Sequence, residues 1–134
     1  MLLVALPLTD ARTAQTESTP GFIRLLPDYR NQKQQGIDSD VGRIWKEDGV
    51  EIHYDIGKMA GNYANCKTCG WTGDEVWRKK QTINGQESIL VFTKFKRLIV
   101  TFPKSNANFY ATIRTEEDMV DMLLMLCTFQ PRRL

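Results

Sequence analysis

Hydrophobic and polar residues alternate along the middle of the chain with the period of a β-strand. Residues 42–58, GRIWKEDGVEIHYDIGK, form two such runs on either side of Glu-Asp-Gly, which predicts a β-hairpin. In the second run, apolar residues at positions 50, 52, 54 and 56 alternate with polar ones. This period of two predicts a strand with one buried face and one face in water.

A second hairpin is predicted at Asn84-Gly85, which separates the strand-like runs 75–83 and 87–92. Asn-Gly favours a type I′ turn, because both central residues of that turn need positive φ. A two-residue turn fixes the register of this hairpin, with the following facing pairs: Ile83 with Gln86, Trp77 with Phe92, and Glu75 with Lys94.

Two more strand-like runs follow at 97–103 and 108–114, the first of them after the tight turn TKFKR. The segment 19–42 differs from these runs. It has a short apolar anchor at 22–26, then Pro27 and polar residues, and it is predicted to be mostly loop. The stretch 57–74, rich in Gly, Asn and Thr, is a second predicted loop.

The hydrophobic period changes near the C-terminus, where TEEDMVDMLLMLCTF predicts a helix. Thr115 is a candidate N-cap, Asp118 stands at the capping-box spacing, and the acidic first turn suits the helix dipole. Between 119 and 129 only Asp121 and Thr128 are polar. We therefore expect this helix to be largely buried, and Cys127 to be a core residue.

Taken together, these elements predict an α+β fold, an antiparallel β-meander of about six strands with a C-terminal apolar helix packed on one face. A chain of 134 residues can bury an ordinary core. We assign residues 20–134 to this single α+β domain.

The first 19 residues are set apart from the domain. They begin with MLLVALPL, which is apolar but too short to span a bilayer, and continue with a polar stretch. This pattern suits a truncated or degenerate export signal that lacks its basic region, or a disordered N-terminus. No other segment approaches the length of a transmembrane helix, so no membrane span is expected.

Composition argues against a strongly charged binding surface. The hydrophobic content of 42%, the charged content of 25% and the net charge of +2 are ordinary for a globular protein, so nucleic acid is a disfavoured partner. Lys and Arg do exceed Asp and Glu between 51 and 110. Basic residues with aromatics at a loop end can bind anions, and scattered solubilising charges explain the same pattern. The candidate anion-binding residues are Arg78, Lys79, Lys80, Lys94, Lys96 and Arg97.

Cys66 and Cys69 have CxxC spacing within NYANCKTCGWTG. Structural zinc needs four ligands, and the chain offers one further cysteine and a single histidine. A thioredoxin-like centre needs CxxC at a helix start, which the following GWTGD does not favour. The remaining interpretations are a local disulfide, a weak metal site or idle thiols, and export would favour the disulfide.

Glu51, His53 and Asp55 occupy one face of a predicted strand, because side chains two residues apart point the same way. A carboxylate beside a histidine can support acid–base chemistry or hold a metal. The solvated face of a half-buried sheet gives the same pattern. The sequence contains no G-x-S-x-G elbow and no complete metal-ligand set. It therefore assigns no catalytic residue, metal or cofactor.

The combination of QGIDSDVGRI, IHYDIGKMAG, WRKKQTINGQ, LIVTFP, NFYATI and DMLLMLCTF resembles a family of small, predicted secreted or envelope proteins of bacteria. The resemblance covers residues 21 to 129. It implies export and an α+β fold, and it implies neither an assigned activity nor catalytic residues. The CxxC is not a defining feature of that family.

The leading expectation is an exported, non-catalytic binding or interaction module with a protein partner in the cell envelope. It would be periplasmic or secreted, or cytoplasmic if residues 1–19 are not a signal remnant. One alternative is a metal-dependent or acid–base enzyme that uses the polar strand face with Glu51, His53 and Asp55. The other is an anion or nucleic-acid binder that uses the basic residues at 78–80 and 94–97.

Overall fold

A computed structural model of the chain describes residues 21–36, 38–66 and 74–131, which contain seven strands, one α-helix and two 3₁₀ turns. The strands are β1 (Arg30–Gln34), β2 (Asp40–Trp45), β3 (Ile52–Ile56), β4 (Glu75–Ile83), β5 (Gln86–Thr93), β6 (Arg97–Phe102) and β7 (Ala107–Thr112). The helix is α2 (Glu116–Leu126), and the 3₁₀ turns are η2 (Tyr63–Asn65) and η3 (Pro103–Ser105).

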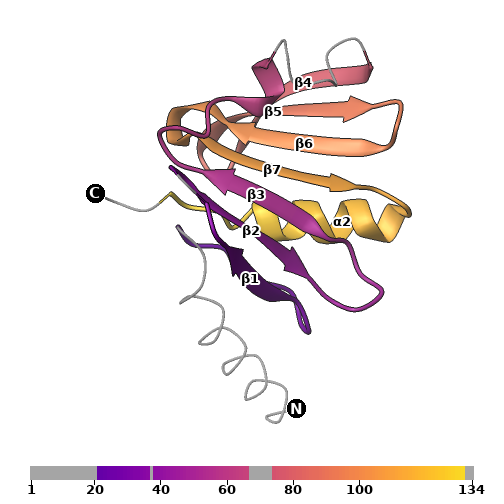
Figure 1. Cartoon of the computed structure of the whole chain (residues 1–134). Helices are drawn as coiled ribbons and strands as arrows, with labels where there is room; N and C mark the ends of the chain where they lie inside the picture. The colour runs from indigo at the N-terminus through magenta and orange to yellow at the C-terminus, as the bar shows by residue number, and fades with distance from the viewer. Residues whose placement is uncertain (1–20, 37, 67–73, 132–134) are drawn as a thin grey trace.

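The seven strands form one antiparallel sheet in the order β1-β2-β3-β7-β6-β5-β4, with α2 on one face (Figure 1). Two meandering runs, β1 to β3 and β4 to β7, meet where β3 pairs with β7. This arrangement confirms the predicted α+β fold with a C-terminal helix on one face of an antiparallel sheet. Among the described residues, no helix has the length and apolar character needed to cross a membrane.

The main core lies between the sheet and α2. Alternate residues of the central strands point toward the helix, so Ile52 and Tyr54 are buried while His53 between them is only partly buried. Three phenylalanines, Phe102, Phe109 and Phe129, meet with ring centroids 4.8–6.0 Å apart. The residues of α2 that complete this core are Met122, Met125 and Leu126.

The predicted hairpins are present. Asn84 and Gly85 both have positive φ, at 51° and 76°, and Ile83 faces Gln86 while Trp77 faces Phe92. The third predicted pair was wrong, because Glu75 lies opposite Thr93 rather than Lys94. A bulge between Glu75 and Trp77 adds a residue to one strand and shifts the register there.

β1 is a strand that the sequence pattern predicted as loop. Its five residues, RNQKQ, are all polar and mostly exposed, because β1 is an edge strand outside the area that α2 covers. Polar contacts attach it to its neighbours: Tyr54 donates to Asn31 at 2.7 Å, and Arg43 donates to Gln32 at 2.8 Å. Because polar contacts hold β1 and no apolar face of it is buried, its sequence shows no hydrophobic alternation.

Helix α2 begins as predicted, because the Thr115 side chain accepts a hydrogen bond from the backbone N–H of Asp118 at 3.1 Å. The expectation that the helix is largely buried was wrong for its outer side. Val120 and Leu124 are 50% and 53% exposed, and Cys127 is exposed and free rather than part of the core. A single helix on a sheet buries only the stripe that faces the sheet.

Candidate functional site

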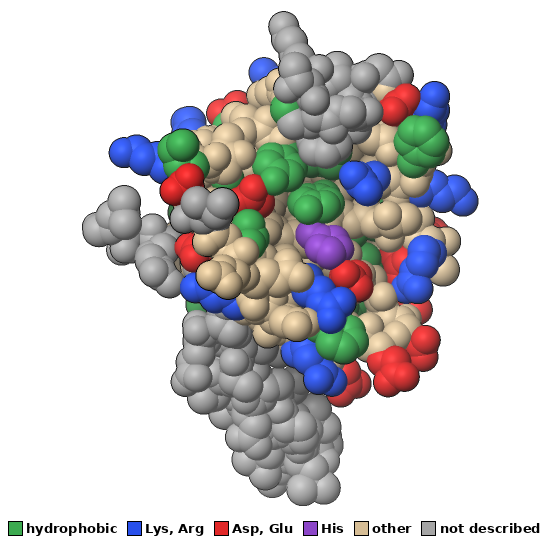
Figure 2. All heavy atoms as spheres, viewed as in Figure 1, with side chains coloured by type: hydrophobic (Ala, Val, Ile, Leu, Met, Phe, Trp, Pro, Cys, Tyr) green, Lys and Arg blue, Asp and Glu red, His purple; other side chains and the backbone are tan. Residues whose placement is uncertain are grey.

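The sheet face opposite α2, which we call the open face, carries the polar positions of the central strands. His53 of β3 lies beside Tyr110 of β7 in the strand register. Figure 2 shows this face, with the single histidine near its centre and both apolar and basic side chains around it. The residues that the helix leaves uncovered therefore combine aromatic and charged groups at one place.

Three aromatic rings stand side by side on the open face. The His53 ring stacks on Tyr110 with centroids 5.3 Å apart, and Tyr110 stacks on Tyr63 with centroids 5.7 Å apart. The guanidinium carbon of Arg97 lies 5.7 Å from the centroid of Tyr110. Arginine over a tyrosine ring is a cation–π contact, which holds the guanidinium close to the sheet.

Asn108 fixes the segment that carries Tyr63. This side chain is fully buried, and its Oδ1 accepts hydrogen bonds from the backbone N–H of Tyr63 and from the Thr101 hydroxyl, both at 2.8 Å. Its Nδ2 donates to the carbonyls of Asp55 and Gly61. Because every polar atom of this amide is used, η2 is held firmly against β6 and β7.

A shallow cavity of about 560 Å³ lies at one end of this ring row. Segments distant in the sequence form it: the residue before β3, then β3, the start of β6, and the end of β7. The lining residues are Gly49, Glu51, His53, Arg97, Tyr110, Ala111, Thr112 and Arg114. Two arginines, an imidazole and two hydroxyl-bearing side chains therefore converge on one hollow of the open face.

The single carboxylate of this lining is already paired. Glu51 lies 3.2 Å from Arg43 and 3.0 Å from the Nε2 of His53. Arg43 is itself held by Gln32 and by the Trp45 ring, 4.5 Å from its guanidinium carbon. Glu51 therefore contributes little uncompensated negative charge to the cavity.

The two cavity arginines differ in what they contact. Arg114 donates to Asp118 at 3.0 Å and to the Gly49 carbonyl at 2.8 Å, and the hydrogen bond and charge of Asp118 raise its pKa. Arg97 is partly buried, and no carboxylate of the described residues lies within ion-pair distance of it. Arg97 thus supplies an uncompensated positive charge to the cavity.

The predicted polar face of Glu51, His53 and Asp55 is divided in the structure. Glu51 and His53 share the cavity, but Asp55 accepts hydrogen bonds from the hydroxyls of Ser39 and Tyr63. Burial and the hydrogen bond to Asp55 raise the pKa of Tyr63. Among the described residues, no group of three His, Cys, Asp or Glu side chains could hold a metal ion.

The predicted basic residues differ in their surroundings. Arg78 is engaged by Glu75, by the Ala64 carbonyl and by Asn65, and Lys94 pairs with Asp74 at 3.2 Å. Lys96 occupies a left-handed turn position with φ 64°. Lys79 and Lys80 lie on the outermost strand β4. Only Arg97 of this set lines the cavity.

Cys66 is disulfide-bonded, and Cys69 lies outside the described residues. The backbone N–H of Cys66 donates to the Tyr63 carbonyl at 3.1 Å, which closes the η2 turn. The cysteine therefore belongs to the segment that places Tyr63 over the open face.

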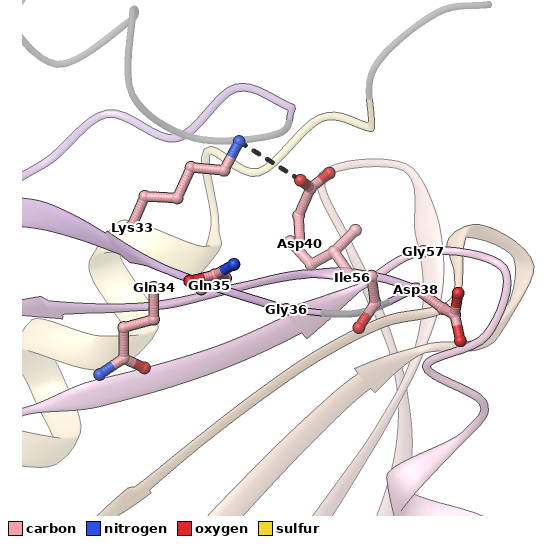
Figure 3. A pocket seen from close by; sticks show the side chains of 9 residues that line it. Lys33, Gln34, Gln35, Gly36, Asp38, Asp40, Ile56 and Gly57 are labelled. Atoms are coloured by element: carbon pink, nitrogen blue, oxygen red, sulfur yellow. Dashed lines mark ion pairs between the residues drawn. The ribbon is translucent and has the colours of Figure 1, made fainter.

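A second hollow, of about 540 Å³, lies where the β1–β2 connection meets the end of β3 (Figure 3). Asp40 pairs with Lys33 at 3.4 Å, and the Asp38 carboxylate points in another direction. The two carboxylates do not converge, and the described residues that line this hollow include no charged group other than Lys33, Asp38 and Asp40.

Of the cavity residues, Glu51, His53 and Arg97 were predicted from the sequence, and Tyr110 and Arg114 were not. Tyr110 occupies a polar-face position in the alternation of β7, and that parity was a usable signal. No protein-family model, curated protein or solved structure matches the chain. The function is therefore inferred from the geometry of the open face.

Proposed function

We propose that the protein is a non-catalytic binding module and that the cavity on the open face binds a small anion bearing a phosphate or carboxylate group. The observation that carries this proposal is Arg97, a partly buried guanidinium in the cavity without a carboxylate partner among the described residues. A guanidinium presents paired N–H donors that match the oxygens of phosphate and carboxylate.

The surroundings of Arg97 support an anion rather than a cation. Arg114 adds a second guanidinium, whose charge is offset by its ion pair with Asp118, and Tyr110 and Thr112 bring hydroxyl groups to the same lining. Glu51, the one carboxylate of the lining, is paired with Arg43 and contacts the Nε2 of His53. The stack of Tyr110 between His53 and Tyr63 keeps the floor rigid, so a ligand would cost little ordering of the site.

Export to the cell envelope is part of the same proposal, supported by the apolar start of the chain and by the disulfide at Cys66. The intact mass of the protein purified from its natural host tests it. Loss of about the first 19 residues would be expected. A full-length mass in the cytoplasmic fraction would contradict export and would leave the anion site unaffected.

The anion site is tested with inorganic phosphate at low ionic strength, by titration followed through amide and arginine side-chain chemical shifts. We expect shifts at Arg97, Tyr110 and Arg114. Arg97→Gln should weaken phosphate binding about tenfold or more, the effect of losing a charge-assisted hydrogen bond. Lys104→Gln, which removes an exposed cation outside the cavity, is the matched control. Equal weakening by both variants would show diffuse attraction and would refute the site.

The Glu51–His53 contact favours a second candidate, acid–base chemistry at the same cavity. It predicts turnover of activated ester or phosphoester substrates that is lost in His53→Gln. Equally slow hydrolysis by the wild type and by His53→Gln would exclude acid–base catalysis, and the binding module would remain as the proposed function.

A further inference from the structure

The outermost strand β4 has a free edge nine residues long. It pairs with β5 on one side, and no strand of the described residues pairs with its other side. Its nine residues are all exposed except Ile83. The opposite edge strand, β1, has five residues. β4 therefore offers a row of backbone donors and acceptors long enough to receive another extended chain.

Three consecutive cations, Arg78, Lys79 and Lys80, occupy the middle of β4. Successive side chains of a strand point to opposite faces. An incoming strand would therefore meet positive charge on both of its faces. Arg78 is held by Glu75, but neither Lys79 nor Lys80 has a carboxylate of the described residues within ion-pair distance.

The positive charges of β4 disfavour pairing with β4 of a second copy of this chain. In an antiparallel pair of β4 strands centred on Lys79, the two Lys79 side chains face each other and Arg78 faces Lys80. Like charges directly opposite each other destabilise a sheet pair. Lysines on an edge strand protect a protein from pairing with itself, and the same lysines attract a strand that carries carboxylates.

Trp77 adds an apolar contact beside these charges. Its ring stacks on Phe92 with centroids 5.8 Å apart and remains 39% exposed, and the neighbouring Val76 is 60% exposed. These side chains lie at one end of the β4 edge, next to the bulge at Glu75. A partner strand could bury them while its acidic residues pair with Lys79 and Lys80.

We infer that the free edge of β4 binds an extended acidic segment of a partner protein by strand addition. This surface is separate from the anion cavity, since no residue of β4 lines that cavity. Backbone hydrogen bonds would supply the sequence-independent part of the affinity, and Lys79 and Lys80 would select for carboxylates.

The test uses the intact protein and a fluorescein-labelled, end-capped peptide of nine residues, the length of β4, with three central glutamates between threonines and valines. Binding is followed by anisotropy. The double variant Lys79→Glu and Lys80→Glu should weaken binding about tenfold or more, because attraction becomes repulsion at two cross-strand pairs. The double variant Lys58→Glu and Lys104→Glu, which makes the same change in net charge at exposed residues outside β4, is the charge-matched control, and all variants should melt as the wild type does.

Two further measurements separate strand addition from simple attraction of charge. A peptide with the same charges but N-methylated at alternate residues should not bind, because it cannot pair with the edge. Amide exchange should slow in β4 and not in β1 when the normal peptide is present. Equal binding of the N-methylated peptide would overturn the inference, as would a dimer of the protein formed through β4. Arg97→Gln should leave peptide binding unchanged, so failure here is distinguishable from failure of the anion site.

Discussion

Arg114 and Asp118 form an ion pair, 3.0 Å from Nε to Oδ2, where β7 ends and α2 begins. The carboxylate of Asp118 is almost fully buried and also accepts a hydrogen bond from the backbone N–H of Arg114 at 2.9 Å. Burial by itself would raise the pKa of Asp118, but the hydrogen bonds from Arg114 and Thr115 lower it. This pair fixes the direction in which the helix leaves the sheet.

Asp118→Ala should lower the free energy of unfolding by about 2–3 kcal/mol, because it leaves the Arg114 N–H without its charged acceptor. Urea denaturation at neutral pH measures this. Glu117→Ala is the control, since Glu117 is an exposed acid in the same helical turn and should cost less than about 0.5 kcal/mol. Equal losses of stability in the two variants would mean that the stabilisation comes from the helix dipole and not from the ion pair.

Asp118 also makes the stability of the protein depend on pH, in a direction that follows from its lowered pKa. A carboxyl group whose pKa is lower in the folded state stabilises the protein above its unfolded pKa, about 3.9 for aspartate. That stabilisation is lost as the pH falls through the lower folded pKa. The stability difference between wild type and Asp118→Asn should therefore be constant above about pH 5 and shrink below about pH 4. A constant difference down to strongly acidic pH would contradict the assignment.

Tyr29 connects three parts of the fold through its hydroxyl. It donates to Asp121 of α2 at 2.9 Å and accepts from the backbone N–H of Val50 at 3.2 Å. Burial and the hydrogen bond to Asp121 raise the pKa of Tyr29 to about 12. Tyr29→Phe should cost about 1–2 kcal/mol at neutral pH, measured by urea denaturation.

The alkaline behaviour of Tyr29 follows from the direction of its shift. Its stabilisation is complete below the unfolded pKa, about 10, and is lost as the pH rises toward 12. The difference in the free energy of unfolding between the wild type and Tyr29→Phe should therefore become smaller between pH 10 and 12. A difference that grows with pH over this range would show that the phenolate is the stabilising form.

The fold could be predicted where burial imposes a period. β3 alternates because α2 covers one of its faces, and Asn84-Gly85 specifies its own turn. β1 lacked any such signal, because an exposed edge strand can be polar throughout. No signal in the sequence indicated the bulge near Glu75 either, since the shifted pairing, in which the Lys94 N–H donates to the Asp74 carbonyl at 2.8 Å, is not specified by any local pattern.

Gly42 of β2 leaves room for the Tyr54 ring of β3, whose hydroxyl donates to Asn31 of β1. A Cβ at this position would lie 2.4 Å from the Tyr54 hydroxyl and 2.7 Å from the Gln32 carbonyl of β1. Gly42→Ala must therefore displace the Tyr54 ring or the β1 backbone, and we expect a loss of about 2–3 kcal/mol in thermal or urea unfolding. Amide exchange should increase most in β1. Tyr54→Leu removes the two side-chain atoms nearest the added Cβ, the hydroxyl oxygen and Cζ, so combined with Gly42→Ala it should cost less than the sum of the two single changes. Strict additivity would contradict the proposed clash.

Asn108 should be the most sensitive polar residue of the sheet. Asn108→Ala removes the acceptor of the Tyr63 N–H and the donors to Asp55 and Gly61, all within a buried site. A loss of about 3 kcal/mol or more is expected from several unsatisfied groups. Amide exchange at Tyr63 and Ala64 should accelerate beyond the global change, while the amides of β5 follow global unfolding. Unchanged protection at Tyr63 would show that η2 is held by something else.

The candidate site was only partly predictable. His53 and Glu51 are neighbours in sequence, so their shared face followed from strand parity. Tyr110 meets His53 because β3 pairs with β7, a long-range pairing that no local pattern specifies. Asp55 has the same parity as His53 but is used by Ser39 and Tyr63, whose positions depend on loops. Strand parity therefore indicated the face but not which residues share a cavity.

Removing the charge of Glu51 should strengthen phosphate binding, whereas removing the charge of Arg97 should weaken it. Its carboxylate lines the cavity and repels an anion there, although Arg43 and His53 reduce that effect. Glu51→Gln keeps the size of the side chain and removes one negative charge. Phosphate should then bind about threefold more tightly at low ionic strength, the effect of a unit charge at ~8 Å in a largely aqueous dielectric. The gain should disappear in high salt, because exposed charges are screened. Weaker binding in Glu51→Gln would show that the carboxylate positions Arg43 or His53 for the ligand, and the electrostatic description of the cavity would then be wrong.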